Sequence, residues 1–301
     1  MKRKIEFILI LFVLAFLSCS EDNAINERID RIKKTGDKSP LLALTMLDSL
    51  NTAVRSMAEG TAMKYDLLKL RLQDKAYITA NSDLVIKKLL KYYEEKGTIA
   101  EKQEVYYYAG SVYRDLQDTP RAISYFLKSS EIAAIYATSD STMQKNSYSN
   151  LFYLFFHVQD YQNAYKYAYE EYVQSQKIGK LDIISLTHLG DALRSLDSLE
   201  QAKQLFVMAL DTVTTTPTLR TDIETICNLL LELSFLKDSL NAQRCYTLLI
   251  NRKSKYEKNQ RQNYFDENNG INYALAHYYD MIGDKDSTIY YNRLILQDGT
   301  D

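Results

Sequence analysis

The feature that most constrains this chain is a pattern of side-chain sizes that recurs along its length. Between Tyr106 and Phe126, small and large residues follow an order that reappears between Leu186 and Phe206, although few letters are shared. In both segments the apolar positions lie three or four residues apart, which places them on one face of an α-helix. A gap of nine residues separates two such runs. The pattern therefore predicts two amphipathic helices joined by a tight turn.

The same spacing occurs in residues 148–171 and 226–249. An alanine opens the second helix of each pair at positions 122, 164, 202 and 242, so successive pairs lie 42, 38 and 40 residues apart. Residues 62–79 and 82–96, closed by Gly97 as a C-cap, and residues 275–296, with a turn at Gly283 and Asp284, predict further hairpins. Ser39 and Pro40 are typical of a helix start. These segments together predict about six helical hairpins.

The recurring small residues indicate where the two helices of a hairpin approach most closely. A large side chain at such a point would push the helices apart, and packing constrains volume more than identity. We expect each glycine of a first helix to face the alanine that opens the second helix. The later aromatic, Phe126 or Phe206, would fill the space where the helices diverge. The predicted packing positions are Gly110, Ala122, Ala164, Gly190, Ala202 and Ala242.

The order of these residues resembles the tetratricopeptide repeat, in which an aromatic, a Leu-Gly pair, a Tyr, an Ala and a later aromatic follow one another. The match is good in the first and third segments, whereas Phe152 and Leu230 replace the glycine in the other two. The repeat is longer than is usual in that family, which predicts extended helices or loops. The resemblance implies an all-α fold, a right-handed α-solenoid of stacked antiparallel helix hairpins, over residues 26–301.

The composition agrees with helices and excludes one class of partner. The 301 residues include only 9 Gly and 3 Pro, and residues that favour helices dominate. The formal net charge of −2 offers no basic stripe to neutralise phosphates, so we expect no nucleic-acid partner.

The N-terminus is typical of a bacterial secretion signal. Three cations at positions 2–4 precede an apolar run from Phe7 to Leu17, which is too short to span a bilayer. The run ends at Ser18 and Cys19, which resembles a lipobox, whose cysteine carries lipid after cleavage. We expect a signal peptide at 1–18, a polar tether at 19–25 anchored through lipidated Cys19, and an outer-membrane location. An uncleaved anchor and an ordinary signal are the alternatives, and the periplasmic or surface-exposed leaflet is left open.

The stretches LLALTMLDSL (41–50), SDLVIKKLLKYYEEKG (82–97) and YYYAGSVY (106–113) resemble a group of tetratricopeptide repeat lipoproteins of Gram-negative gut anaerobes. Some relatives in that group add a transmembrane helix and a DNA-binding output. We find neither here, which argues against a complete transmembrane sensor.

Residues suited to catalysis do not form an evident constellation. The three histidines, His157, His188 and His277, fall in three different repeats, and their spacing does not bring them together. We therefore expect no catalytic residues, no metal and no cofactor. Cys227 and Cys245 fall on the two helices of one hairpin, where backbones are usually ~8–10 Å apart, so we expect free thiols rather than a disulfide.

The remaining face of the first helices predicts a binding groove. The chain has 25 tyrosines and no tryptophan, and several tyrosines fall on this face. In tetratricopeptide arrays that face binds partner peptides, and the lysine and asparagine of the family's carboxylate clamp are absent here. Carried over by position, the resemblance implies these groove residues: Tyr107, Ser111, Arg114, Asn150, Tyr153, His157, Thr187, Asp191, Arg194 and Asn228, with Tyr273 and His277 as an extension.

These features predict a non-enzymatic envelope lipoprotein that binds a partner protein or an extended peptide on the concave face of its solenoid. One alternative is a structural subunit of an outer-membrane assembly complex, which would co-purify with a barrel protein. Another is a surface lipoprotein that binds nutrients or glycans, with saccharides stacked on its tyrosines.

Overall fold

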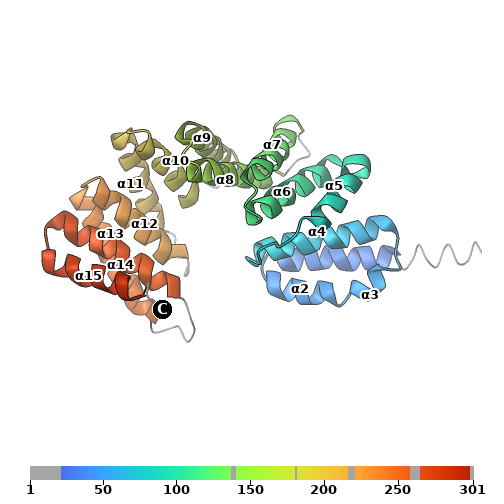
Figure 1. Ribbon diagram of the computed structural model, residues 1–301, viewed down its shortest axis with the longest axis horizontal. Helices are drawn as coiled ribbons and strands as arrows, with labels where there is room; N and C mark the ends of the chain where they lie inside the picture. Colours follow the sequence, from blue (N-terminus) through green and yellow to red (C-terminus); the bar gives the residue numbers. More distant parts are fainter. Residues whose placement is uncertain (1–21, 137–139, 180–181, 216–220, 258–264, 299–301) are drawn as a thin grey trace, which may run out of the picture. The chain divides into compact units, whose positions relative to one another are not determined.

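The structure is a computed structural model, and it describes residues 22–136, 140–179, 182–215, 221–257 and 265–298. All regular secondary structure within these ranges is helical (Figure 1). The chain divides into two compact units, Met1–Ser147 and Tyr148–Asp301. The boundary falls inside one helix, α8 (Ser141–His157), and each unit is described by itself.

The first unit begins with a helix over residues 22–36. It continues with α2 (Pro40–Asp48), α3 (Asn51–Val54), α4 (Glu59–Lys75), α5 (Leu84–Lys96), α6 (Ile99–Asp115) and α7 (Thr119–Ile135). The first helix lies against α4, where the side-chain amide of Asn26 donates to Thr61 Oγ1 at 2.7 Å. Buried Ile29, Leu47 and Leu72 belong to one apolar core in this unit.

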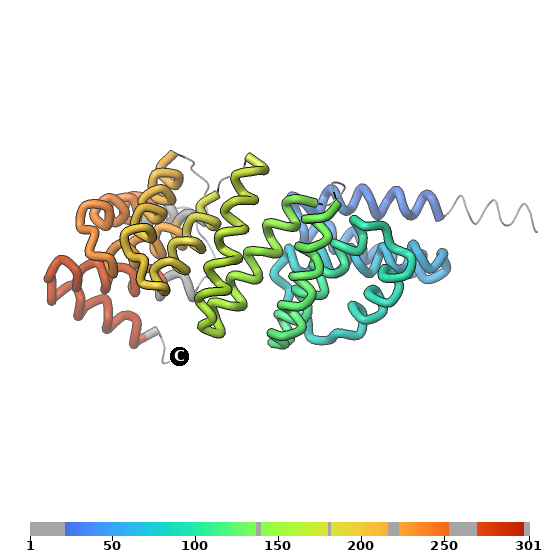
Figure 2. Tube along the Cα trace, turned by 90° about the horizontal axis from the view of Figure 1, so that it is seen from above, coloured from blue at the N-terminus to red at the C-terminus, as the bar shows by residue number. Residues whose placement is uncertain are grey.

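The second unit takes in the rest of α8 and continues with α9 (Tyr161–Lys177), α10 (Ile183–Ser195) and α11 (Leu199–Thr215). It ends with α12 (Thr221–Phe235), α13 (Ser239–Glu257), α14 (Phe265–Ile282) and α15 (Lys285–Asp298). Consecutive helices run back and forth as hairpins, seen from above in Figure 2. Helix α12 packs against both α13 and α14. The predicted pairs at 148–171, 186–209, 226–249 and 275–296 are therefore confirmed.

The hairpin turns share one backbone geometry that the sequence pattern did not specify. The second-to-last residue before the second helix has a left-handed backbone, with φ between 53° and 80°. The next residue donates its N–H to the carbonyl five positions earlier, for example Asp118 to Tyr113 at 2.8 Å, which is a Schellman motif. The left-handed residues are Gln117, Gln159, Asp197, Lys237 and Gly283. An aspartate follows four of these five, and each caps the N–H three residues on: Asp118, Asp160, Asp238 and Asp284.

The packing positions are buried as predicted, but their contacts correct one expectation. Ala122, Ala164, Ala202 and Ala242 are fully buried. A Cβ placed on Gly110 would lie 2.7 Å from Phe126, and one on Gly190 would lie 2.6 Å from Phe206. Each glycine thus accommodates the ring of the later aromatic rather than facing the alanine. The ring lies over the glycine because the absent side chain leaves room there for a flat group.

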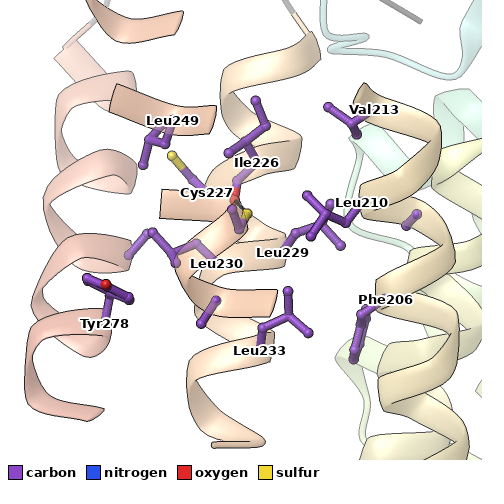
Figure 3. Packing of buried hydrophobic residues seen from close by; sticks show 14 of the residues in the cluster. Phe206, Leu210, Val213, Ile226, Cys227, Leu229, Leu230, Leu233, Leu249 and Tyr278 are labelled. Atoms are coloured by element: carbon purple, nitrogen blue, oxygen red, sulfur yellow. Dashed lines mark hydrogen bonds between the residues drawn. The ribbon is translucent and has the colours of Figure 1, made fainter. Parts of the chain in front are cut away.

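The core of the second unit lies around α12 (Figure 3). Leu229 and Leu233 point toward Phe206 and its neighbours on α11, whereas Leu230 points toward Tyr278 on α14. Cys227 and Cys245 are buried and are not joined by a disulfide bond, as expected. The Cys245 thiol donates to the carbonyl of Ile226 at 3.2 Å, and burial raises the pKa of this thiol.

The structure describes part of the predicted N-terminal region. The helix of residues 22–36 includes positions 22–25, which were predicted to belong to a polar tether. The predicted helix start is confirmed, because Ser39 precedes α2 and Pro40 occupies its first turn; the Ser39 side chain makes no capping hydrogen bond. Cys19 and the signal segment lie outside the described residues. Within the described ranges, no helix combines the length and apolarity that crossing a bilayer requires.

Candidate functional site

The first helices of successive hairpins in the second unit enclose a cavity of about 530 Å³. We call it the inner cavity. Volumes of ~300–1,000 Å³ are usual for ligand sites. Helices α8, α10 and α12 supply nearly all of its lining, and Phe206 of α11 supplies the rest. The lining residues are Phe152, Tyr153, Phe156, His157, Ile183, Ile184, Thr187, His188, Asp191, Phe206, Glu224, Thr225, Asn228, Leu229, Leu231 and Glu232.

The rim of the inner cavity exposes apolar surface. Tyr153 and Ile184 are both 51 % exposed, although each is large and hydrophobic. The Tyr153 ring lies 4.6 Å from the exposed ring of His157 on the next turn of α8. Adjacent exposed aromatic and aliphatic groups lose water favourably when a partner covers them. The rim can therefore supply apolar contact area to a ligand.

Deeper in the cavity, a histidine connects the aromatic wall to a buried acid. The His188 ring stacks on Phe152 with centroids 4.2 Å apart, and its Nδ1 lies 2.8 Å from Glu171 Oε2. Glu171 belongs to α9 and is fully buried, while its second carboxylate oxygen has no hydrogen-bond partner in the described structure. A contact at the ring face and another at the ring nitrogen together fix the position of His188 in the wall.

The pKa values of two carboxyl groups in the cavity are raised above their ordinary values. Burial, assisted by the negative charge of Glu232, raises the pKa of Asp191 to about 7. Burial also raises the pKa of Glu232, against the opposing effect of Arg194. Arg194 Nε lies 2.5 Å from Glu232 Oε2, an ion pair whose angles are not those of a hydrogen bond. Arg194 thereby compensates Glu232 and leaves Asp191 without a close counter-ion.

The structure brings half of the predicted groove residues together. Five of the ten line the inner cavity: Tyr153, His157, Thr187, Asp191 and Asn228. Arg194 lies beside the cavity and is engaged by Glu232, and Asn150 is half-buried on α8 outside the lining. The predicted extension at Tyr273 and His277 does not reach it: these rings contact each other on α14, with centroids 4.6 Å apart.

In the first unit the predicted groove is wrong at two positions. Tyr107 is only 9 % exposed because its ring packs edge-on against Tyr108 and Phe126. Ser111 is 3 % exposed. Arg114 is half-buried and forms ion pairs with Asp74 and Asp115. Its guanidinium is therefore held by the protein's own carboxylates.

Sequence reasoning missed several residues of the site, and helical spacing could have found some of them. Glu224 and Glu232 lie four residues on either side of Asn228, so all three share one face of α12. His188 was treated as isolated from the other histidines, yet it lines the same cavity as His157. The pairing of His188 with Glu171 joins two helices, and no local pattern indicates it.

The cavity combines polar groups with an apolar rim. Its polar groups are carboxyls, an amide, a hydroxyl and imidazoles around an apolar rim. Among the described residues, no group of three or more His, Cys, Asp or Glu side chains is arranged to hold a metal ion. Such a mixture can bury an apolar group and bind a polar one at the same time.

Comparison with solved structures identifies the architecture. A Rap protein complexed with Competence and Sporulation Factor has a TM-score of 0.60 and 12 % identity, over 92 % of this chain and 76 % of that one. The apo form of RapI has a TM-score of 0.60 and 13 % identity, over 93 % and 97 %. BtubC (BKLC) from P. vanneervenii has a TM-score of 0.53 and 14 % identity, over 79 % and 91 %.

No family model matches the sequence, and no curated protein does. At these identities the likeness concerns the fold alone. Together with the helical hairpins described above, it confirms the predicted fold class: this chain is an all-α helical-repeat protein of the tetratricopeptide-like solenoid type.

Proposed function

We propose that this protein is a non-enzymatic lipoprotein of the bacterial envelope, and that its inner cavity binds an extended segment of a partner protein. The observation that carries the proposal is the construction of the cavity. Exposed Tyr153 and Ile184 form an apolar rim above the inward-facing polar groups of Thr187 and Asn228. An extended segment has both kinds of group to offer, since side chains and backbone amides alternate along it.

The membrane part of the proposal depends on the N-terminal sequence. Lipid on Cys19 would hold the repeat domain at the outer membrane while the inner cavity faces its partner. A Rap protein of this fold was solved in complex with Competence and Sporulation Factor, so the architecture is compatible with holding a factor. A binding module tethered by lipid would act by bringing its partner to the membrane surface.

Site-specific photocrosslinking tests the proposal. A photoreactive phenylalanine is introduced at Tyr153 in one strain and at Tyr169 in another. The two tyrosines have matched exposures, 51 % and 48 %, but Tyr169 lies on α9 outside the cavity lining. After irradiation of intact cells, mass spectrometry identifies the attached segment.

We expect one protein segment to be attached at position 153 and not at position 169. Equal labelling at both positions, or none at position 153, would refute the cavity as the binding surface. Attachment of a saccharide at position 153 would instead support the glycan-binding alternative. Labelling of the lipid-modified chain with a radioactive fatty acid, abolished by Cys19→Ala, tests the anchor separately.

A further inference from the structure

The inner cavity contains acidic groups without matching cations. Asp191 of α10 and Glu224 and Glu232 of α12 line it, and none of the described residues in its lining is Lys or Arg. The neighbouring Arg194 neutralises Glu232 through their ion pair. Two acidic side chains are then left over, one deep in the cavity and one, Glu224, exposed at its edge. The cavity thus offers negative charge to whatever enters it.

Asp191 is the acidic side chain of the cavity that a cationic partner would stabilise most. Within the described structure its carboxyl makes no hydrogen bond and no ion pair, although His188 and Arg194 act on it at longer range. Partial removal of a carboxylate from water without a partner costs free energy, and together with the negative charge of Glu232 this raises the pKa of Asp191 to about 7. A cation beside Asp191 would recover part of that free energy and favour the ionised form.

The rim indicates what kind of cation fits. The side chains of Lys and Arg carry an apolar stem that lies along hydrophobic surface while the charged end reaches further. Tyr153 and Ile184 provide that surface at the entrance. The ring faces of Tyr153 and Phe156 can also attract a cation. A bare metal ion would gain nothing from such a rim, and in the part of the chain that the structure describes no three His, Cys, Asp or Glu side chains are grouped to hold one.

We propose that the segment bound in the inner cavity is anchored by a basic side chain, Arg or Lys, whose charged group pairs with Asp191. This inference rests on the proposed function, because it names the chemistry of the segment that the cavity binds. Glu224 at the edge attracts the incoming charge, and Glu232 stays paired with Arg194. The adjacent residue of the segment, apolar or aromatic, covers Tyr153.

Binding should also depend on pH, since a cation favours ionised Asp191. The groups that face this carboxyl are His188 and Arg194 on its own helix and Glu232 on α12, while His157 on α8 and Glu224 also line the cavity. Affinity for the basic segment should rise between about pH 6 and pH 8 as Asp191 loses its proton. The Asp191→Asn variant removes the pH dependence that comes from Asp191 and leaves the pH dependence that comes from the histidines, so it distinguishes the two.

Selection from a random peptide library tests the inference. The full chain in detergent is immobilised and presented with a phage-displayed library of random heptapeptides. Parallel selections use Asp191→Asn and the control Glu200→Gln, which removes an exposed charge on α11 outside the cavity lining. An enriched peptide is then synthesised with its basic residue intact or replaced by norleucine, and affinities are measured by fluorescence polarisation. Thermal melting shows whether each variant is folded.

We expect the wild type and Glu200→Gln to enrich peptides with Arg or Lys beside an apolar residue. Norleucine should weaken binding by at least about tenfold in these two proteins, as expected when one member of a buried charged pair is removed, and by less than about threefold in Asp191→Asn. Enriched peptides without a basic residue, or equal norleucine effects in all three proteins, would overturn the inference while leaving peptide binding intact. Failure to enrich any peptide would count against the proposed function itself.

Discussion

The contact between Gly190 and Phe206 makes the most quantitative prediction about the fold. An alanine Cβ at position 190 would lie 2.6 Å from Phe206 Cε1 and 2.8 Å from Cζ. Ordinary carbon contacts are at ~3.5–4.0 Å, so the ring must move by about 1 Å. Phe206 is fully buried in the core around α12, which leaves it little freedom to do so.

Overpacking of this size costs about 1–3 kcal/mol. Replacing a glycine inside a helix by alanine returns up to about 1 kcal/mol of helix propensity. We therefore expect Gly190→Ala to lower the free energy of unfolding by a net ~1–2 kcal/mol, or Tm by roughly 2–8 °C for a unit of this size. Gly270 on α14 has nothing within 4 Å of the corresponding position, so Gly270→Ala should be neutral or stabilising.

A double-mutant cycle isolates the contact. Replacing the ring by a smaller side chain in Phe206→Leu should remove most of the destabilisation caused by Gly190→Ala. The coupling free energy between the two positions should then be ~1 kcal/mol or more. Thermal and urea unfolding of the full chain, followed by circular dichroism, measure these differences. Equal shifts for Gly190→Ala and Gly270→Ala, or strictly additive effects with Phe206→Leu, would refute the assigned packing.

Three further predictions concern charge, thiols and turns. The pKa of Asp191 is about 7 in the folded chain instead of 3.8, so between these two values the folded chain keeps a proton that the unfolded chain releases. The free energy of unfolding should therefore fall as pH rises between these two pKa values, and it should fall less steeply in Asp191→Asn. Urea unfolding at several pH values measures both slopes. Cys227 and Cys245 should react with a thiol reagent only after denaturation and show no change in gel migration on reduction; rapid labelling of the native chain would contradict their burial. Gly283 has φ +80°, so Gly283→Ala should lower the unfolding free energy by ~1–2 kcal/mol, and an unchanged melting curve would show that the turn does not need this conformation.

The sequence allowed the helical hairpins to be predicted because packing repeats side-chain volume at fixed spacing. Ala122 and Ala202 are buried as that reasoning requires. The predicted contact partner of each glycine was wrong, because a volume pattern shows which positions are packed but not which side chains touch each other. Only the backbone geometry places the Phe126 ring on Gly110.

The candidate site was less predictable for a related reason. Positions carried over from a repeat family give the helix face, and this succeeded at Tyr153 and Asp191, which share the cavity. It failed at Tyr107, whose ring turns inward against Phe126. The raised pKa of Asp191 arises from burial and from Glu232 on a different helix, and sequence spacing contains neither effect.

The most direct test of the proposed binding surface compares two tyrosine variants. The segment identified by crosslinking at position 153 is synthesised as a peptide, and its affinity is measured for the wild type, Tyr153→Ala and Tyr169→Ala. We predict a loss of at least about tenfold for Tyr153→Ala, as for an aromatic anchor at an interface, and an unchanged affinity for Tyr169→Ala. Equal affinities for all three proteins would contradict binding in the inner cavity.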